Sequence, residues 1–421
     1  MAGSHVIWNK VSANIVELAK NKNLIFRGFR QGAKFDPDFN QGPPGGNTVT
    51  VKQPFRSFIR EGWQWNGQDV NRQSIQITAD QVFGADLNLD PDEQALYAER
   101  DWNQFRKNVI VPIAAQISTE LDLRAARFGK LWTSNITGAL GTNATTSSAY
   151  SDPRSRLIEL GAMETPRKKT MAITPAQMQA WIAGTPNLLS LFYVDPVRKA
   201  FNDGYIGHYG DFDVVESMSL QNHTTGVWAT VATGVTMATA NQTGSSINVA
   251  CTTGDTFKAG DKISIAGMNA VNPMTRQSLG YNRQFTILQD ATGAASAATL
   301  TIDPPIIGPG SAYQNVDALA AAAAVVTLMP GTTMVDATAK SGKYGMAFTD
   351  EAFAAVSIDV PQPSKGFEEI GSYTDPETGL SFAMLCWYEP RTRMKCWRWD
   401  VYIGFGALRP SESSIIVAGL R

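Results

Sequence analysis

The clearest hydrophobic pattern lies near the C-terminus, in the stretch of residues 395–417. Apolar side chains fall on one side of an extended chain there, and mostly polar side chains fall on the other, which is the alternation of a half-buried strand. The apolar side consists of Trp397, Trp399, Val401, Ile403 and Phe405.

Two glycines late in this predicted strand, Gly404 and Gly406, indicate a close approach of another backbone or a bulge. Arg409 and Pro410 then end the strand, because proline has no backbone donor for the ladder. A second apolar run at residues 415–417 predicts another core-forming strand.

The longest helical pattern covers residues 91–135. Asp90 is a suitable cap and Pro91 suits the first turn. Apolar residues recur at spacings of three or four from Trp102 to Trp132. A helix of about forty residues would form a rod of about 60 Å at 1.5 Å per residue. Pro112 removes one internal hydrogen bond, and we expect a kink near it.

The first 47 residues have the pattern of an arm with a short amphipathic helix, which we expect to pack on a neighbouring molecule. Residues 48–90 have an extended pattern around Asn66-Gly67, a strong hairpin signal. A two-stranded ribbon is marginally stable alone, so its apolar residues imply that it lies on another surface.

The composition changes sharply between about residues 219 and 331, where Thr, Ala, Gly, Asn and Val dominate. Short strands separated by glycine turns predict a small all-β barrel or sandwich. Because mixed α/β segments flank it, we expect a domain inserted into a host with its ends close together. The flanks contain a predicted helix at "TPAQMQAWIAG", capped by Thr174, and a short helix at residues 350–355 followed by a strand.

Composition supports an α+β chain of two or three domains: 421 residues, 43% hydrophobic, 36 glycines and 21 prolines. The net charge of −2 argues against a surface built throughout to hold nucleic acid. The three cysteines, Cys251, Cys386 and Cys396, are expected to be free thiols. No secretory signal or membrane-length apolar run is present, so we expect an intracellular, soluble chain that is not bound to a membrane.

The sequence contains no motif that indicates catalysis. Its three histidines, His5, His208 and His223, have no ligand partners at metal-binding spacing, and no nucleophile or phosphate-loop motif occurs. We therefore predict no catalytic, cofactor-binding or metal site, and no enzyme.

Basic and aromatic residues alternate in the predicted ribbon. One interpretation is that the ribbon binds single-stranded nucleic acid, whose bases stack on the aromatic rings. The near-neutral charge favours another, in which the arginines pair with acids on a neighbouring subunit. The candidate interface residues are Arg56, Arg60, Trp63, Trp65 and Arg72.

The order of these elements resembles the major capsid proteins of tailed bacteriophages, the HK97-like fold, and within them the P22-type coat proteins with an inserted β-barrel domain. The resemblance is carried by "FKAGDKISIAGM", "FTILQDATG", "FTDEAFAAVSI" and the closing "WDVYIGFGALRPSESSIIVAG". It implies an N-terminal arm, an E-loop, a spine helix, and peripheral and axial domains. The implied boundaries are 1–47 (arm), 48–90 (E-loop), 91–135 (spine helix), 136–218 (peripheral and axial, first part), 219–335 (inserted barrel), 336–385 (axial, second part) and 386–421 (C-terminal strands of the peripheral domain).

The same resemblance implies a coat protein that forms hexamers and pentamers of an icosahedral shell around double-stranded DNA. The implied partners are a scaffolding protein, a portal protein and decoration proteins, with assembly in the host bacterial cytoplasm and a final location in the virion capsid. An alternative is a phage tail or surface protein with a carbohydrate-binding β domain, which explains the Thr-rich insert but not the long helical rod.

Overall fold

The computed structural model describes residues 24–31, 47–53, 55–56, 59, 62–65, 67, 69, 74–90, 104, 106–162, 169–184, 207–228, 234–329, 339–359, 369–374 and 380–419. The chain divides into two compact units. Unit 1 contains the described parts of Met1–Gln53, Gln73–Ala125 and Phe353–Leu408, and unit 2 contains those of Pro54–Arg72, Ala126–Ala352 and Arg409–Arg421.

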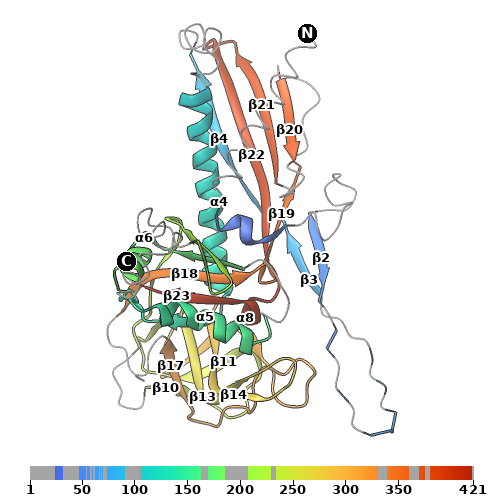
Figure 1. Ribbon diagram of the computed structural model, residues 1–421, viewed down its shortest axis with the longest axis vertical. Helices are drawn as coiled ribbons and strands as arrows, with labels where there is room; N and C mark the ends of the chain where they lie inside the picture. Colours follow the sequence, from blue (N-terminus) through green and yellow to red (C-terminus); the bar gives the residue numbers. More distant parts are fainter. Residues whose placement is uncertain are drawn as a thin grey trace, which may run out of the picture. The chain divides into compact units, whose positions relative to one another are not determined.

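Unit 1 is built on a six-stranded sheet (Figure 1). Its strands run in the order β1 (Arg30–Gln31), β19 (Phe353–Ile358), β22 (Met394–Ala407), β21 (Ser381–Glu389) and β20 (Glu369–Thr374), and β4 (Gln81–Leu89) also pairs with β22. The predicted C-terminal strand is therefore β22, in the middle of this sheet. Its predicted apolar side is buried, and so are Cys396 and Asp400 on the other side, because neighbours cover both faces.

A close backbone approach occurs where two glycines predicted it. The strands β2 (Thr48–Lys52) and β3 (Ser74–Thr78) form a two-stranded antiparallel sheet. A Cβ atom at Gly404 would collide with the backbone of Thr78, and one at Gly406 would collide with the side chain of Ile77. The predicted backbone approach is confirmed at Gly404, whereas the close contact at Gly406 is with a side chain.

The described part of the long helix is α4 (Val111–Trp132), preceded by a π-helical turn, η5 (Arg106–Ile110). Pro112, where we expected a kink, is the second residue of α4 and follows this π turn directly. Ile117, Leu121 and Ala125 of the predicted apolar series are buried, whereas Ile113 is half-buried and its neighbour Ala114 is buried instead. The first residues of the predicted rod, 91–103, lie outside the described residues.

Residues 24–31 belong to the predicted arm, yet they pack inside unit 1. Ile25, Phe26 and Phe29 are buried, and the ring of Phe29 stacks on that of Phe353 with centroids 4.9 Å apart. The expectation that the arm packs on a neighbour is therefore wrong for this segment. The predicted amphipathic helix further towards the N-terminus lies outside the described residues.

Unit 2 contains a seven-stranded sheet in the order β5 (Asn135–Gly138), β23 (Ser414–Ala418), β18 (Ser341–Thr349), β6 (Lys169–Ile173), β8 (Phe212–Glu216) and β7 (His208–Tyr209), with β9 (Asn222–Thr224) also paired to β18. The second predicted C-terminal strand is β23. It pairs with β18 and β5 rather than with β22, because the short helix α8 (Pro410–Ser413) separates the two strands.

Two further helices of unit 2 are α5 (Ser147–Glu159) and α6 (Pro175–Gly184). Thr174 caps α6 as predicted: its Oγ1 accepts a hydrogen bond from the Gln177 amide at 3.1 Å, and Gln177 Oε1 accepts the Thr174 amide at 3.0 Å. This reciprocal pair is a capping box.

One predicted helix is wrong. Residues 350–352 form a turn, and residues 353–355 are the first half of strand β19 (Phe353–Ile358). All six residues of β19 are buried, so the strand has no polar side to produce an alternating pattern.

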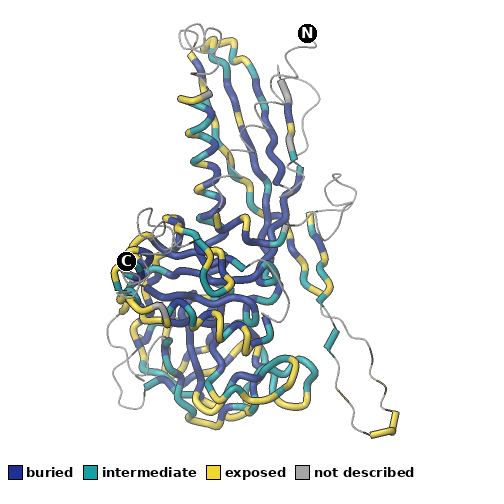
Figure 2. Tube along the Cα trace, viewed as in Figure 1, coloured by how far each residue is buried: buried dark blue, intermediate teal, exposed yellow. Residues whose placement is uncertain are grey.

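The insert is a closed barrel of six strands, in the order β10 (Val235–Met237), β11 (Gly244–Ala250), β16 (Ala297–Ile306), β14 (Ser278–Ile287), β13 (Lys262–Val271) and β17 (Val325–Met329), with a small β12–β15 pair (Thr256–Phe257 and Ala291–Thr292) beside it. Its two ends meet where β9 pairs with β18, with Thr224 opposite Ser341. The expected insertion with adjacent ends is confirmed. Figure 2 shows a buried barrel interior with exposed residues at its loops.

Candidate assembly interface

The most exposed large apolar side chains of the described residues lie in one short segment after β2. We call residues 54–72 the ribbon segment. Trp63 is 101% exposed, Ile59 is 88% exposed and Trp65 is 87% exposed. Because monomeric proteins rarely expose neighbouring large apolar side chains, these three residues indicate a surface that another molecule covers.

Arg56 lies at the start of the ribbon segment and is held by its own chain. Its guanidinium Nη2 atom lies 2.6 Å from both carboxylate oxygens of Glu412 in α8, and each side chain is less than one-fifth exposed, at 18% and 19%. The guanidinium carbon also lies 5.8 Å from the ring centroid of Tyr313 in the barrel. Charge-assisted hydrogen bonds of this kind are stronger than neutral ones.

The structure places three of the five predicted interface residues. Trp63 and Trp65 are exposed as an interface requires, and Arg56 has an intrachain partner instead of an unpaired charge. Arg60 and Arg72 lie outside the described residues, so their pairing with a neighbour stays a prediction. Sequence reasoning missed Glu412, whose only signal was an acidic residue in the first turn after Pro410.

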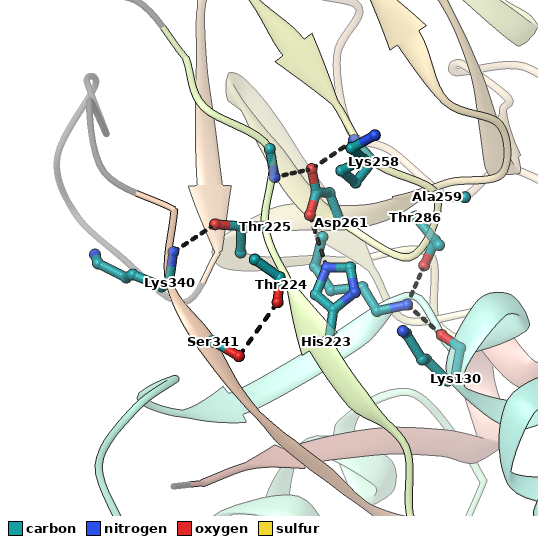
Figure 3. A network of polar contacts seen from close by, with 12 residues as sticks. Lys130, His223, Thr224, Thr225, Lys258, Ala259, Asp261, Thr286, Lys340 and Ser341 are labelled. Atoms are coloured by element: carbon teal, nitrogen blue, oxygen red, sulfur yellow. Dashed lines mark hydrogen bonds and ion pairs between the residues drawn. The ribbon is translucent and has the colours of Figure 1, made fainter. Parts of the chain in front are cut away.

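A buried polar network holds the ends of the insert to the barrel (Figure 3). Asp261 accepts hydrogen bonds at one carboxylate oxygen from the amides of Gly226 and Lys258, at 3.1 and 2.9 Å. Its other oxygen lies 2.7 Å from His223 Nε2, and both side chains are buried. Burial lowers the pKa of His223, while the hydrogen bond to Asp261 opposes that shift.

Side chains of the barrel strands β13 and β14 bond backbone groups of the surrounding host domain. Lys262 Nζ donates to the carbonyl of Lys130 near the end of α4 at 2.8 Å, and Thr286 Oγ1 donates to the carbonyl of Thr133 at 2.7 Å. Gln284 bonds both the amide and the carbonyl of Ile136 in β5, at 2.7 and 3.3 Å. The barrel therefore satisfies backbone groups that the helix end and the sheet edge leave open.

Burial is the largest cause of the pKa shifts of the charged groups in the contact between the barrel and its host. It lowers the pKa of the fully buried Lys262 well below the ordinary lysine value, and nearby Lys130 lowers it further. Burial also raises the pKa of Asp303 to about 6, against the opposing pull of Lys262 and Arg283.

Within the described residues, no group of three or more His, Cys, Asp or Glu side chains is placed to hold a metal ion. The described helices include none with the length and apolarity needed to cross a membrane. Cys251, Cys386 and Cys396 are free thiols. His208 lies in β7, and its Nδ1 atom is 3.1 Å from Oδ1 of Asp213 in β8.

The sequence model of the P22 coat protein, gene protein 5, matches residues 47–419. The chain therefore belongs to the P22 coat protein family. The match includes the ribbon segment, α4, the inserted barrel and every strand described above except β1. No match was found among curated proteins.

Solved structures that match the chain include phage proteins. A chain of Mycobacterium phage Che8 is 10% identical with a TM-score of 0.44, and covers 88% of this chain and 84% of its own. A chain of the capsid of cyanophage P-SCSP1u is 11% identical with a TM-score of 0.41, and covers 89% and 84%. The I-domain of the CUS-3 coat protein is 21% identical over 24% of this chain and 100% of its own, with a TM-score of 0.19.

Family membership confirms the fold class and function predicted from the sequence. The chain is a phage major capsid protein with a mixed α+β architecture and an inserted six-stranded barrel. It belongs to a homo-oligomeric shell in the virion, and its role is structural.

Proposed function

We propose that copies of this chain form the hexamers and pentamers of a closed icosahedral shell around double-stranded phage DNA. Assembly takes place in the host bacterial cytoplasm with a scaffolding protein and a portal protein, and decoration proteins bind the finished shell. The chain performs no catalysis in this role. The family match supports this proposal, because it spans residues 47–419.

In this arrangement residues 48–90 are the E-loop, 91–135 the spine helix and 219–335 the inserted domain. Residues 1–47 form the arm. The remaining host segments, 136–218, 336–385 and 386–421, divide between the axial and peripheral domains. The position of β23 in the unit 2 sheet favours a boundary near Arg409 rather than a single C-terminal block.

The observation that carries the proposal is the exposure of Trp63, Trp65 and Ile59 in the ribbon segment. The occupant that covers them is a second copy of this chain, because a coat protein meets many identical copies. Each tryptophan buries roughly 200 Å² on contact, worth a few kcal/mol at about 25 cal/mol per Å². Repeated over a shell, such contacts give a closed assembly from individually modest interfaces.

The test is assembly of the purified full-length chain, followed by sedimentation and electron microscopy. Wild type is expected to form closed shells, and Trp63→Ser/Trp65→Ser is expected to remain a folded monomer with an unchanged circular dichroism spectrum. Met218→Ser is the matched control, since Met218 is 83% exposed but lies outside the ribbon segment. A wild-type chain that forms no shells contradicts the proposed function, and normal shells from the double variant contradict the role of the tryptophans.

A further inference from the structure

The Arg56–Glu412 pair joins two positions 356 residues apart within a single copy of the chain. Both belong to unit 2, and neither is open to solvent by more than 19%. A pair so shielded is screened less by salt than an exposed one, and losing one partner leaves the other charge poorly solvated. The contact therefore has the strength to hold the start of the ribbon segment in place.

Hydrogen bonds to backbone carbonyls hold α8, the short helix that contains Glu412. The carbonyl of Ser411, one residue earlier, accepts hydrogen bonds from Arg283 at 3.0 Å and from Asn135 at 2.9 Å. Ser414 Oγ donates to the carbonyl of Pro410 at 2.7 Å. The barrel, through Arg283, and the sheet, through Asn135, thus hold α8 independently of Arg56.

Groups around the guanidinium of Arg56 stabilise its positive charge next to Glu412. The ring of Tyr313 lies beside the guanidinium and adds a cation–π attraction. Arg283 is buried and also interacts electrostatically with Glu412, so one carboxylate attracts two guanidinium groups from distant parts of the chain. Glu412 therefore links the ribbon segment, α8 and the barrel.

We propose that Arg56 and Glu412 form an intrachain latch that fixes the start of the ribbon segment on α8 and the barrel in every copy. The latch presents Ile59, Trp63 and Trp65, three to nine residues further along, in one orientation before a second copy binds. Arg56 is thus a positioning residue for assembly, and it acts within its own copy. This inference rests on the proposed function and deepens it, since preorganisation lowers the ordering cost of each shell contact.

Cross-linking separates this latch from a pair exchanged between copies. Arg56→Cys/Glu412→Cys is made in a Cys251→Ser background, since Cys251 is the half-exposed native thiol. Light and nitrogen-15-labelled chains are mixed before assembly, and shells are treated with a short thiol-specific bifunctional cross-linker. Mass spectrometry of the linked peptides is expected to find only light–light and heavy–heavy pairs. Light–heavy pairs, or shells without cross-links, overturn the proposal.

Charge exchange gives a second measurement that does not depend on cysteines. Arg56→Glu and Glu412→Arg are each expected to reduce the yield of shells by about tenfold or more. The double variant Arg56→Glu/Glu412→Arg is expected to restore it. A mixture of the two single variants is expected to stay as poor as either one, because each copy still contains a broken pair. Rescue by mixing overturns the latch.

The matched control is Lys258→Glu, which breaks an exposed 3.0 Å ion pair with Asp290 on the barrel. It is expected to leave the shell yield unchanged. Circular dichroism and thermal unfolding of every variant identify any that fail to fold, and the cross-linking result decides in that case. Failure of wild type to assemble contradicts the proposed function itself, whereas wild-type shells with rescue by mixing contradict only the latch.

Discussion

Thr286 in β14 of the inserted barrel donates a hydrogen bond of 2.7 Å from its Oγ1 to the carbonyl oxygen of Thr133, which follows the last turn of α4. The same hydroxyl accepts a hydrogen bond of 2.9 Å from Lys262 Nζ. All three residues are buried, so water is a poor substitute for either partner. The insert and its host thus share a polar contact that depends on one hydroxyl group.

Replacement of this hydroxyl is expected to destabilise the chain. Thr286→Val keeps the side-chain shape but leaves the Thr133 carbonyl and the Lys262 ammonium without their partner, which costs about 2–3 kcal/mol of unfolding free energy. Chemical denaturation of the unassembled chain measures the loss. Thr299→Val is the control, because the Thr299 hydroxyl bonds Asn248 on the exposed barrel surface. Equal losses in the two variants contradict the prediction.

The sequence predicted those elements whose signal is local. The alternation in β22, the Thr174 cap, the two glycines opposite β3 and the turn-rich insert all express their structure within a few residues. The fully buried strand β19 has no such signal, because apolar residues on both faces hide the period of two.

The candidate interface also contains features that the sequence predicted and features that it did not. The exposure of the tryptophans was predictable, because the sequence pattern predicted a two-stranded ribbon, which has no core of its own to enter. In the structure Trp63 and Trp65 lie outside the strands β2 and β3. The partner of Arg56 was not, since no local pattern relates positions separated by 356 residues. The same holds for the segment around Phe26, whose place inside unit 1 depends on Asp122 of α4.

Asp122 makes the stability of unit 1 dependent on pH. Its carboxylate accepts hydrogen bonds from the amides of Leu24 and Phe26, both at 2.9 Å. Burial nevertheless raises the pKa of Asp122 to about 6, because the backbone hydrogen bonds offset only part of the lost solvation. The folded chain therefore binds this proton more tightly than the unfolded chain, in which an aspartate pKa is about 3.9.

The difference between the folded and unfolded pKa of Asp122 sets the direction in which stability changes with pH. Protonation of Asp122 stabilises the folded state, so its contribution is largest below about pH 4 and is lost as the pH rises through about 6. Wild type is expected to gain about 1 kcal/mol relative to Asp122→Asn between pH 7 and pH 5. Denaturation of both proteins across this range is the measurement, and a stability difference that does not change with pH contradicts it.

The capping box of α6 is expected to contribute measurably to unit 2. Thr174→Ala removes the hydroxyl that accepts the Gln177 amide, and the usual cost of such a loss is about 1 kcal/mol. Thr174→Ser retains the hydroxyl and serves as the matched control, with a smaller expected loss. Thermal unfolding of the two variants is compared, and an alanine variant as stable as the serine variant contradicts the role of the cap.

Gly404 has the most restrictive position in β22. A Cβ atom there would lie 2.7 Å from the Cα atom of Ala79 and closer still to the carbonyl oxygen of Thr78, so neither obstacle is a flexible side chain. Gly404→Ala is therefore expected to separate β3 from β22 and to cost several kcal/mol, about as much as a badly overpacked core. In Gly67→Ala, the matched control, the nearest atom is the exposed Trp65 Nε1 at 3.2 Å, which is free to move aside. Denaturation midpoints of both variants give the comparison. A Gly404→Ala chain as stable as the Gly67→Ala chain would mean that β3 does not rest on β22 in solution.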